Sequence, residues 1–597
     1  MTMKTFPRFA LWTLLALTLL LPACAAAPVA TPAPLEAPAP THSAPVTLTI
    51  LHPQSPEILN IHLTNNVKDF EPARIVYEPL AVFDKNGVLQ PALAKEIPSL
   101  ENGGLAKDGK SVTWKLREDV LWSDGQPFTA ADVAFTFEYI KDPLVKSSSA
   151  INYSLVKEVV ALDDFTARVT FSEVNPAWYV PFVGTRGVIL PSHIFADYKN
   201  EHALEAPANQ MPVGTGPYMV KAPGIEPQEV LLLGAQIVQT TKLTFVPNPN
   251  YREPERIAFD RIIWRGGGTS NEGARLSLQV GEVDVAYDLE SVDVDTLSEL
   301  SKSGQGRLVA AFAPGVERLL LNQTDWQRPS ASGEYSSREV PHPLLSDKVV
   351  RQAIAYAINR DAIAALYGAN GLPAYAILVS PPQYQSPREF YKYDPATANA
   401  LLDEAKFLDV NGDGVREANG VNIKLTFKSY VGGIAQSAQK LIQKDLRAIG
   451  LDVDIKIVDS KNLFAKGAEN PESVSRFNAD MLMFRTRSSS PDPTAFMAFW
   501  TCNAIPQASN NWQGNNNERW CNPEYDALLE QVKTELDEQK RAEIFIQMND
   551  LLVEDAAAIP LVWRASALGV NKTLNGIEPT PWDTVTWNVQ NWTFGAP

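Results

Sequence analysis

Residues 121–133 read LWSDGQPFTAADV, and this stretch sets the local fold from which the rest of the chain can be interpreted. Its Asp-Gly dipeptide at 124–125 is a turn signal, and residues 129–132 resemble a helix capping box. An apolar stripe at helical spacing follows over 133–140 and predicts a helix. Upstream, apolar and polar residues alternate over 112–116, which predicts a half-buried strand. Strand and helix signals in this order are typical of a mixed α/β protein.

Signals farther along the chain extend the same pattern. Ser346 is placed to cap a helix that follows it, and Asp394-Pro395 is a good N-cap and first-turn pair for another. A third helix over 441–449 ends at Gly450, a natural left-handed terminator. Alternating residues over 453–457 then predict a strand. This helix–glycine–strand unit predicts a partly parallel sheet with helical cover.

Composition sets limits on size and partners. The chain has 597 residues, of which 45% are hydrophobic and 9% aromatic, as expected for a globular protein with a large core. Its net charge of −17 argues against a nucleic-acid partner, because nucleic acids select basic surfaces. The part that follows the N-terminal region is long enough for two or three domains at about 100–200 residues each.

The N-terminal region predicts export. Residues 1–23 combine a positive start with an apolar run, as a secretory signal peptide does. The run ends in Leu-Pro-Ala-Cys at 21–24, which resembles a bacterial lipobox, so Cys24 is the expected lipidation site. An ordinary signal peptide with an incidental cysteine is the alternative. Residues 24–45 are mostly Ala, Pro and Thr, a composition that predicts an extended tether.

The two remaining cysteines form an even pair in a chain expected to be exported. We therefore expect Cys502 and Cys521 to form a disulfide. Two free thiols are the alternative. A metal role is not expected, because the six histidines show no ligand spacing with these cysteines.

Six motifs together carry a family resemblance over nearly the whole mature chain. The motifs are Val76-Tyr77-Glu78-Pro79-Leu80, residues 121–133, Pro212-Val213-Gly214-Thr215-Gly216-Pro217-Tyr218, Asn248-Pro249-Asn250-Tyr251, Gly281-Glu282-Val283-Asp284, and residues 349–360. In this order they are similar to those of the extracellular solute-binding proteins of peptide-type ABC transporters, family 5, which include oligopeptide-, dipeptide- and nickel-binding-like lipoproteins.

The resemblance implies a fold class and a division of the chain. The fold would be α/β and periplasmic-binding-protein-like (type II, cluster C), with two lobes, a hinge and an extra subdomain on the first lobe. Lobe I would comprise residues 46–90, 213–313 and 562–597, its additional subdomain 91–212, and lobe II 314–561. The motifs themselves read as structural: Gly214-Thr215-Gly216 as a tight turn, and Arg351 and Arg360 as surface charges or packing partners.

The resemblance also implies a function. The protein would be a non-catalytic, monomeric receptor without a cofactor, lipid-anchored on the outer face of the cell membrane, or on the periplasmic side if an outer membrane exists. It would bind a peptide or peptide-like solute between its lobes and deliver it to an ABC permease and its ATPase. An oligosaccharide or another non-peptide solute is the alternative, and an exported hydrolase is a weaker one because no catalytic motif is found. A sensor role shares the fold, and nickel or haem is disfavoured by the few, scattered histidines.

One departure from the family pattern bears on the solute. In peptide binders of this family, an aspartate three residues before an Asp-Pro or Glu-Pro pair binds the free amino terminus. The similar pair here is Asp492-Pro493, and the earlier position is Ser489. We expect Arg487, Ser489 and Asp492 at the cleft, and a solute that lacks a free amine there or carries an acidic or hydroxylated group. The alternative is a shifted loop in which Arg487 pairs with a surface carboxylate.

Two further sets of residues are candidates. Trp178, Tyr179 and Trp500 could line the cleft, although the core is the interpretation we favour for each of them. Asp409, Asn411, Asp413 and Glu417 have part of the spacing of a calcium loop, but its twelfth position is Gly420 instead of a bidentate glutamate. An Asx-type turn explains the same loop residues without a metal, and it is the interpretation we favour.

Overall fold

The structure is a computed structural model that describes residues 45–233, 236–465, 470–488 and 490–595. The predicted signal peptide, Cys24 and nearly all of the tether lie outside these residues. So does Ser489. Among the residues described, no helix combines the length and apolarity needed to cross a bilayer.

Most strands belong to one large mixed sheet. Its members, in spatial order, are β17 (Asp452–Val458), β16 (Lys424–Tyr430), β18 (Met481–Arg487), β12 (Gly306–Leu321), β19 (Ala558–Asn571), β11 (Val285–Ala286), β1 (Thr47–His52), β10 (Arg261–Gly266), β9 (Gln236–Pro247) and β7 (Tyr218–Val220), with β13 (Gly371–Pro373) beside β19 and β8 (Glu226–Leu233) beside β9. Strand β16 runs parallel to β17 and β18, and β1 runs parallel to β10 and β11. The predicted partly parallel sheet is therefore confirmed.

The remaining strands form small antiparallel sheets. They are β4 (Ser111–Lys115), β6 (Thr166–Phe171) and β5 (Val156–Asp163) in one sheet, and three pairs: β2 (Ala81–Phe83) with β3 (Leu89–Pro91), β14 (Glu417–Ala418) with β15 (Val421–Asn422), and β20 (Leu574–Asn575) with β21 (Thr593–Phe594). Strand β4 is the one predicted from residues 112–116.

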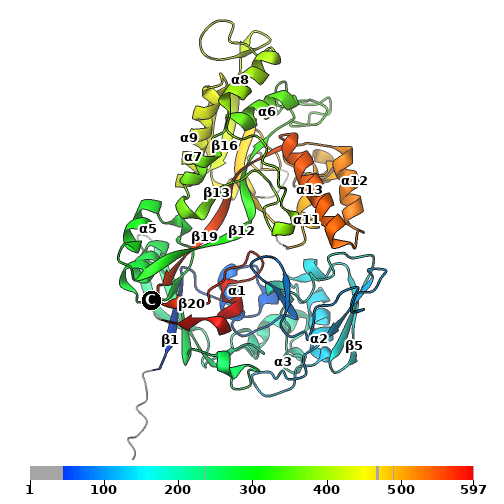
Figure 1. Ribbon diagram of the computed structural model, residues 1–597, viewed down its shortest axis with the longest axis vertical. Helices are drawn as coiled ribbons and strands as arrows, with labels where there is room; N and C mark the ends of the chain where they lie inside the picture. The colour runs from blue at the N-terminus through cyan, green and yellow to red at the C-terminus, as the bar shows by residue number, and fades with distance from the viewer. Residues whose placement is uncertain (1–44, 234–235, 466–469, 489, 596–597) are drawn as a thin grey trace, which may run out of the picture. The chain divides into compact units, whose positions relative to one another are not determined.

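Helices cover both ends of the large sheet and divide into two groups (Figure 1). Those of the lower group in the figure are α1 (Val67–Ala73), α2 (Ala130–Lys141), α3 (Ser192–Phe195), α4 (Ser270–Ala274) and α5 (Val294–Ser301). Those of the upper group are α6 (Lys348–Ala357), α7 (Arg360–Ala365), α8 (Pro395–Glu404), α9 (Gly433–Arg447), α10 (Ser460–Phe464), α11 (Thr494–Met497), α12 (Pro523–Val532) and α13 (Glu538–Glu554). We call the lower group with its strands lobe I and the upper group lobe II.

Strands β12 and β19 run between the two lobes (Figure 1). They pair antiparallel from Gly306 opposite Asn571 to Leu320 opposite Ala558. The register shifts between Phe312 and Val316, where the chain passes from one lobe to the other. Because the two strands remain partners in both lobes, they form a continuous sheet connection between them.

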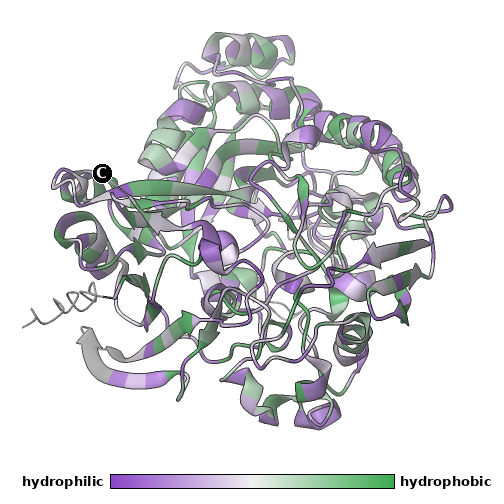
Figure 2. Ribbon diagram, turned by 60° about the horizontal axis from the view of Figure 1, so that its bottom comes forward, coloured by the Kyte–Doolittle hydropathy of each residue, from purple (hydrophilic) through white to green (hydrophobic). Residues whose placement is uncertain are grey.

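Each lobe has its own hydrophobic core. Trp264 lies fully buried in the core of lobe I, and Phe427 in that of lobe II. Phe135 and Phe195, from the predicted subdomain, pack into the lobe I core, whereas Trp114 belongs to a separate cluster. The subdomain is therefore packed onto lobe I. Figure 2 shows that the peripheral helices mix hydrophilic and hydrophobic residues, as expected for helices with one face toward a core.

The stretch at 121–133 forms the expected turn and capped helix. Helix α2 begins after Thr129, and a capping box joins Thr129 to Asp132. The Asp132 carboxylate is buried and does more than cap the helix. One oxygen accepts hydrogen bonds from the Thr129 amide (3.0 Å) and the Trp122 indole (3.4 Å). The other accepts from the Ser192 amide and hydroxyl, at 2.9 and 2.7 Å. This one side chain thus joins the turn, α2 and α3.

The glycines at 214 and 216 serve close backbone approach. The Gly216 amide donates to the Val76 carbonyl at 2.8 Å. A Cβ on Gly214 would lie 2.1 Å from the same carbonyl oxygen, so no larger residue fits without movement. Neither glycine has a positive φ. The requirement for glycine here is therefore one of space, and it does not come from the tight turn that the sequence suggested.

Two other family motifs meet at the same place. Glu78 and Arg252 form a bidentate pair with N–O distances of 2.7 and 2.8 Å. The Asn250 amide donates to the carbonyls of Trp122 and Ser123, at 3.3 and 3.1 Å. Hydrogen bonds therefore hold the first four motifs against one another, which gives these motifs a structural role.

Several helix boundaries also test the sequence interpretation. Asp394 caps α8, and Gly450 has the left-handed backbone expected after α9. The cap before α6 is Asp347, which accepts from the Val349 amide, so the prediction of Ser346 was wrong by one residue. The Ser346 hydroxyl instead donates to the His342 carbonyl.

Arg351 and Arg360 are packing partners and not surface charges. Both are buried and donate to backbone carbonyls, Arg351 to Asp555 and Arg360 to Pro560. These bonds attach α6 and α7 to the chain around β19.

We predict that Asp132→Ala lowers the free energy of unfolding by more than about 3 kcal/mol, because it leaves several buried donors without an acceptor. Urea denaturation of the full chain measures the change. Asp164→Ala is the matched control, since Asp164 is exposed and its side chain makes no hydrogen bond within the described residues. Equal midpoints for the two variants would contradict the prediction.

Candidate functional site

A pocket of about 260 Å³ lies between the lobes, and we call it the interlobe pocket. Lobe I and its subdomain contribute Phe70, Tyr179, Arg186 and Asp583, and lobe II contributes Arg487 and Ser490. Arg487 is the last residue of β18, so the strand that flanks the crossing leads directly into the pocket. A solute here would contact both lobes at once.

The two acidic residues of the interlobe pocket are already occupied. Arg74 forms a bidentate pair with Asp583, with both N–O distances 3.0 Å, and the side chains of this pair are buried. Glu71 accepts hydrogen bonds from the Tyr287 hydroxyl and the Val585 amide, at 2.9 and 3.0 Å. Burial raises the pKa of Glu71 to about 7, although these bonds partly oppose the shift.

The two arginines of the interlobe pocket lack a partner of opposite charge among the described residues. Arg186 donates to neutral acceptors, the Thr64 carbonyl (3.1 Å), the Ser148 hydroxyl (2.7 Å) and the Asn65 amide oxygen (2.9 Å), and it stacks on Phe70. Burial lowers the pKa of Arg186. Arg487 is exposed. Within the described parts of the chain, neither arginine lies within ion-pair distance of a carboxylate.

Behind Arg487, charges cluster at the crossing of β12 and β19. Glu317 is fully buried and accepts from Arg564 at 3.0 Å. Arg485 lies opposite Glu317 across the β12–β18 pair, and its buried Nε has no hydrogen-bond acceptor among the described residues. Burial lowers the pKa of Arg485, and repulsion from Arg564 and Arg487 lowers it further, whereas Glu317 opposes the shift. Glu290 also attracts Arg485, so the crossing places buried charges of both signs beside the interlobe pocket.

A second pocket of about 280 Å³ lies within lobe II, and we call it the lobe II pocket. Its aromatic lining consists of Phe464, Phe484, Phe499 and Trp512, and its amide lining of Gln513, Asn515 and Asn517. The Asn517 amide oxygen is buried and has no donor among the described residues. The pocket thus combines apolar faces with an unsatisfied acceptor.

The loop that walls this pocket is backbone-strained. Asn511, Trp512 and Arg519 have φ values of 53°, 58° and 57°, in the left-handed region that non-glycine residues seldom adopt. Strain of this kind costs free energy and persists only where surrounding contacts hold it. Arg476 stacks over the Trp512 ring at 3.9 Å and is one such contact.

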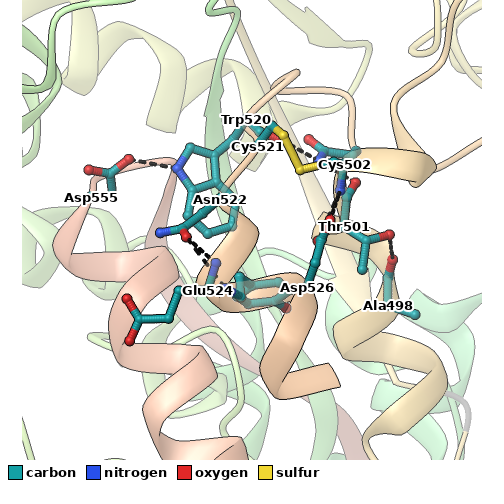
Figure 3. The surroundings of a disulfide bond; sticks show 11 residues. Ala498, Thr501, Cys502, Trp520, Cys521, Asn522, Glu524, Asp526 and Asp555 are labelled. Atoms are coloured by element: carbon teal, nitrogen blue, oxygen red, sulfur yellow. Dashed lines mark hydrogen bonds between the residues drawn. A yellow bond between two sulfur atoms is a disulfide. The ribbon is translucent and has the colours of Figure 1, made fainter. Parts of the chain in front are cut away.

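A disulfide closes the same loop (Figure 3). Cys502 and Cys521, the pair expected from sequence, are bonded and 19 residues apart. The Cys502 amide donates to Asp526 of α12 at 3.1 Å, and the Trp520 indole donates to Asp555 at 2.6 Å. Both ends of the loop are therefore attached to the helical part of lobe II.

Asp492 does not present a free carboxylate. It pairs with Arg541 and also accepts from the Tyr179 hydroxyl at 3.1 Å, a contact that joins the subdomain to lobe II. Burial would raise the pKa of Asp492, but the attraction of Arg541 and hydrogen bonds from Arg541 and Thr494 hold it below its ordinary value. The carboxylate is ionised and already neutralised, so it lacks the free charge that would bind a solute ammonium group.

The three aromatic candidates lie in different places. Tyr179 lines the interlobe pocket. Trp178 is packed in a core cluster with 7% of its surface exposed, and Trp500 is completely buried beneath Arg318. The burial of both tryptophans therefore supports the interpretation that they belong to the core.

The backbone amides of the 409–417 loop donate hydrogen bonds to the side chains of the same loop. Asp409 accepts from the amides of Gly412 and Gly414, at 2.7 and 2.9 Å, and Glu417 accepts from those of Val410 and Asn411, at 2.6 and 3.2 Å. Asn411 and Asp413 accept in the same way from residues two positions on. Within the described ranges, no group of three or more His, Cys, Asp or Glu residues is placed to hold a metal ion. These bonds are those of an Asx-type turn.

Sequence reasoning missed Arg186, Arg564 and Glu317. Arg485 carried a usable signal, because Arg485 and Arg487 stand two positions apart, and residues so spaced share one face of a strand such as β18. No signal of this kind marks the other three, which reach the site from distant parts of the chain.

Two lobes joined by paired strands, with a charged pocket between them, define a two-lobe solute-binding protein. The sequence profile of the bacterial extracellular solute-binding proteins, family 5, matches residues 88–507. The chain belongs to this family.

Curated relatives and solved structures agree with this assignment. The chain is 26% identical to the nickel-binding periplasmic protein of Escherichia coli K12, over 76% of this chain and 78% of that protein. It is 24% identical to di/tripeptide-binding protein 1 of Pseudomonas aeruginosa, over 86% and 88%. The ABC transporter substrate-binding protein CtaP of Listeria monocytogenes has the same fold, with a TM-score of 0.69, 22% identity, and coverage of 92% of this chain and 99% of that one. These relatives are named as binding proteins, not as enzymes.

We predict that replacing both Cys502 and Cys521 with serine lowers the free energy of unfolding by about 3 kcal/mol, because the closed loop is freed in the unfolded chain. Urea denaturation with and without reductant measures the effect. Reductant should destabilise the natural protein and leave the double variant unchanged, which makes the variant its own control. An equal response of both proteins would contradict the role given to the disulfide.

We predict a pH-dependent effect of Glu71→Gln. Since the folded-state pKa is raised from 4.5 to about 7, the stability that Glu71 contributes is fully present below about pH 4.5 and is lost as the pH rises through about 7. Glutamine stays neutral at every pH. The free energy of unfolding of the variant should therefore rise by up to about 3 kcal/mol, relative to that of the natural protein, between pH 5 and 8. Urea denaturation across this range tests it, with the exposed Glu255→Gln as control. A pH-independent difference for Glu71→Gln would contradict it.

Proposed function

We propose that this protein is the receptor of an ABC importer and that it binds a peptide or peptide-like solute between its lobes. The observation that carries the proposal is the interlobe pocket, which is lined from both lobes in a member of a solute-binding family. A solute in this place stabilises the closed arrangement and so gives a permease a liganded form to recognise. The P. aeruginosa relative named as a di/tripeptide-binding protein supports the peptide class.

The receptor acts outside the cytoplasm as a lipid-anchored monomer. Cys24 is the lipid-bearing residue, residues 24–45 are the tether, and the partners are a membrane permease and its ATPase. This part of the proposal rests on the N-terminal sequence and on the extracellular family. No cofactor or catalysis is needed, since the solute is delivered unchanged.

The solute needs no free amino group at Asp492. Arg541 neutralises the Asp492 carboxylate, and the position three residues earlier is a serine. The solute in the interlobe pocket contacts three of the residues that line it, Arg487, Tyr179 and Ser490. A peptide with a blocked amino terminus should therefore bind as well as a free one.

An oligosaccharide is the second candidate. The lobe II pocket favours it, because aromatic faces with amide side chains such as Asn517 suit a sugar ring and its hydroxyls. Nickel, which one relative is named for, would prefer imidazole or other nitrogen ligands. The six histidines of this chain are few and scattered.

The test is binding of Ala-Ala-Ala, N-acetyl-Ala-Ala-Ala and maltotriose to the purified full chain. We expect both peptides to raise the melting temperature, since a ligand at 100 times its Kd stabilises by about 2.7 kcal/mol. Ser490→Trp fills the interlobe pocket and should abolish the shift. Ser332→Trp, on an exposed loop, should keep it.

Other results would redirect the proposal. A response to maltotriose alone would replace the peptide with a sugar. A response only to the free-amine peptide would overturn the interpretation of Asp492. Cleavage of a peptide, seen by mass spectrometry, would make the protein an enzyme.

A further inference from the structure

We propose that Arg186 and Arg487 form a two-sided clamp for an anionic group of the solute, a carboxylate or a phosphate, in the interlobe pocket. This inference rests on the proposed receptor function and specifies the chemistry of its solute. The two arginines come from opposite sides of the pocket, Arg186 from the subdomain and Arg487 from lobe II. An anion held by both would join the lobes.

Arg487 has charge to offer. It is exposed at the end of β18, and the structure gives its guanidinium no hydrogen bond and no ion pair among the described residues. Arg186 is held in position by neutral groups and by the Phe70 ring, which fix its fork without cancelling its charge. A guanidinium prefers a carboxylate or phosphate, which it binds through two parallel hydrogen bonds.

The acidic residues nearby do not neutralise these arginines. Asp583 is paired with Arg74 and also accepts from the Thr185 hydroxyl at 2.6 Å. Glu71 is turned toward the amides of Val585 and Thr586. Both carboxylates have partners of their own, so the pocket keeps an excess of positive charge.

The surroundings do not cancel this charge. Arg485 stands behind Arg487 with an unsatisfied buried Nε, and Arg564 stands beside it. Glu317 accepts from Arg564 at 3.0 Å and Glu290 also attracts Arg485, so the cations at the crossing have carboxylates of their own. A pocket that is walled by protein and lined by two arginines without carboxylate partners among the described residues raises the local concentration of anions.

The pocket also limits what can be bound. Its volume of about 260 Å³ holds a carboxylate or phosphate and a few further atoms, and not a long chain.

The experiment measures the affinity of the full chain for three tripeptides by titration calorimetry. Ala-Glu-Ala carries a side-chain and a terminal carboxylate, Ala-Gln-Ala only the terminal one, and the C-terminal amide of Ala-Gln-Ala neither. We expect at least one loss of a carboxylate to weaken binding roughly 10- to 100-fold, as for a hydrogen bond to a charged group. If affinity falls on amidation, the clamp binds the terminal carboxylate of the peptide. If affinity falls when Glu is replaced by Gln, the clamp binds the side-chain carboxylate.

The variants assign the effect to the clamp. Arg487→Gln and Arg186→Gln should remove the discrimination among the three peptides, and Arg338→Gln, an exposed arginine elsewhere, should retain it. Arg487 has no structural bonds to lose, so its variant separates binding from folding. Arg487→Lys should restore part of the discrimination, since it keeps the charge and loses the fork.

Two results would overturn the clamp. Equal affinities for the three peptides would leave a receptor without an anion preference, and full discrimination in Arg487→Gln would assign the preference to a group other than Arg487. If none of the peptides binds the natural protein, the peptide proposal fails instead, and the clamp is then tested with citrate and inorganic phosphate. Binding of either anion that Arg487→Gln abolishes supports the clamp, and failure of both to bind overturns it.

Discussion

Strands β12 and β19 stay hydrogen-bonded to each other on both sides of the gap between the lobes, and this pairing organises the molecule. Each of the two strands contributes to the cores of both lobes. Val309 and Val570 pack in the core of lobe I, and Leu319 and Ile559 in that of lobe II. The register of the pairing shifts twice, between Phe312 and Val316 and between Glu317 and Arg318. The first shift falls where the sheet leaves lobe I, directly beside Glu317 and Arg564. Charge and backbone irregularity therefore meet at the only sheet connection between the lobes that the described residues show.

Sequence predicted local structure well where a short segment contains all of its own determinants. The capping box at 129–132, the Asp394 cap and the left-handed Gly450 need only neighbouring residues, and all three occur. Family motifs extended this to the fold class. The role of Asp132 was predicted in part, since its bonds to Ser192 depend on a contact 60 residues away. The Ser346 cap failed because two adjacent polar residues compete, and Asp347 has the charge to prevail.

The site was less predictable for the same physical reason. Arg487 could be placed because it precedes an Asp-Pro pair. Arg186 and Glu317 could not, since each reaches the site through tertiary contacts with no local pattern. Burial was also invisible in the sequence, and it changes the meaning of Asp492 and Trp500. Both belong to a plausible binding motif, yet one is neutralised by Arg541 and the other lies in the core.

The disulfide between Cys502 and Cys521 bears on when the wall of the lobe II pocket is complete. The loop carries Trp512 and Asn517, two of the groups that shape the lobe II pocket. A cytosol keeps thiols reduced, whereas compartments beyond the inner membrane allow them to oxidise. Newly made chains would thus lack a finished pocket wall until translocation is over. Oxidation after export would then complete this wall of the lobe II pocket.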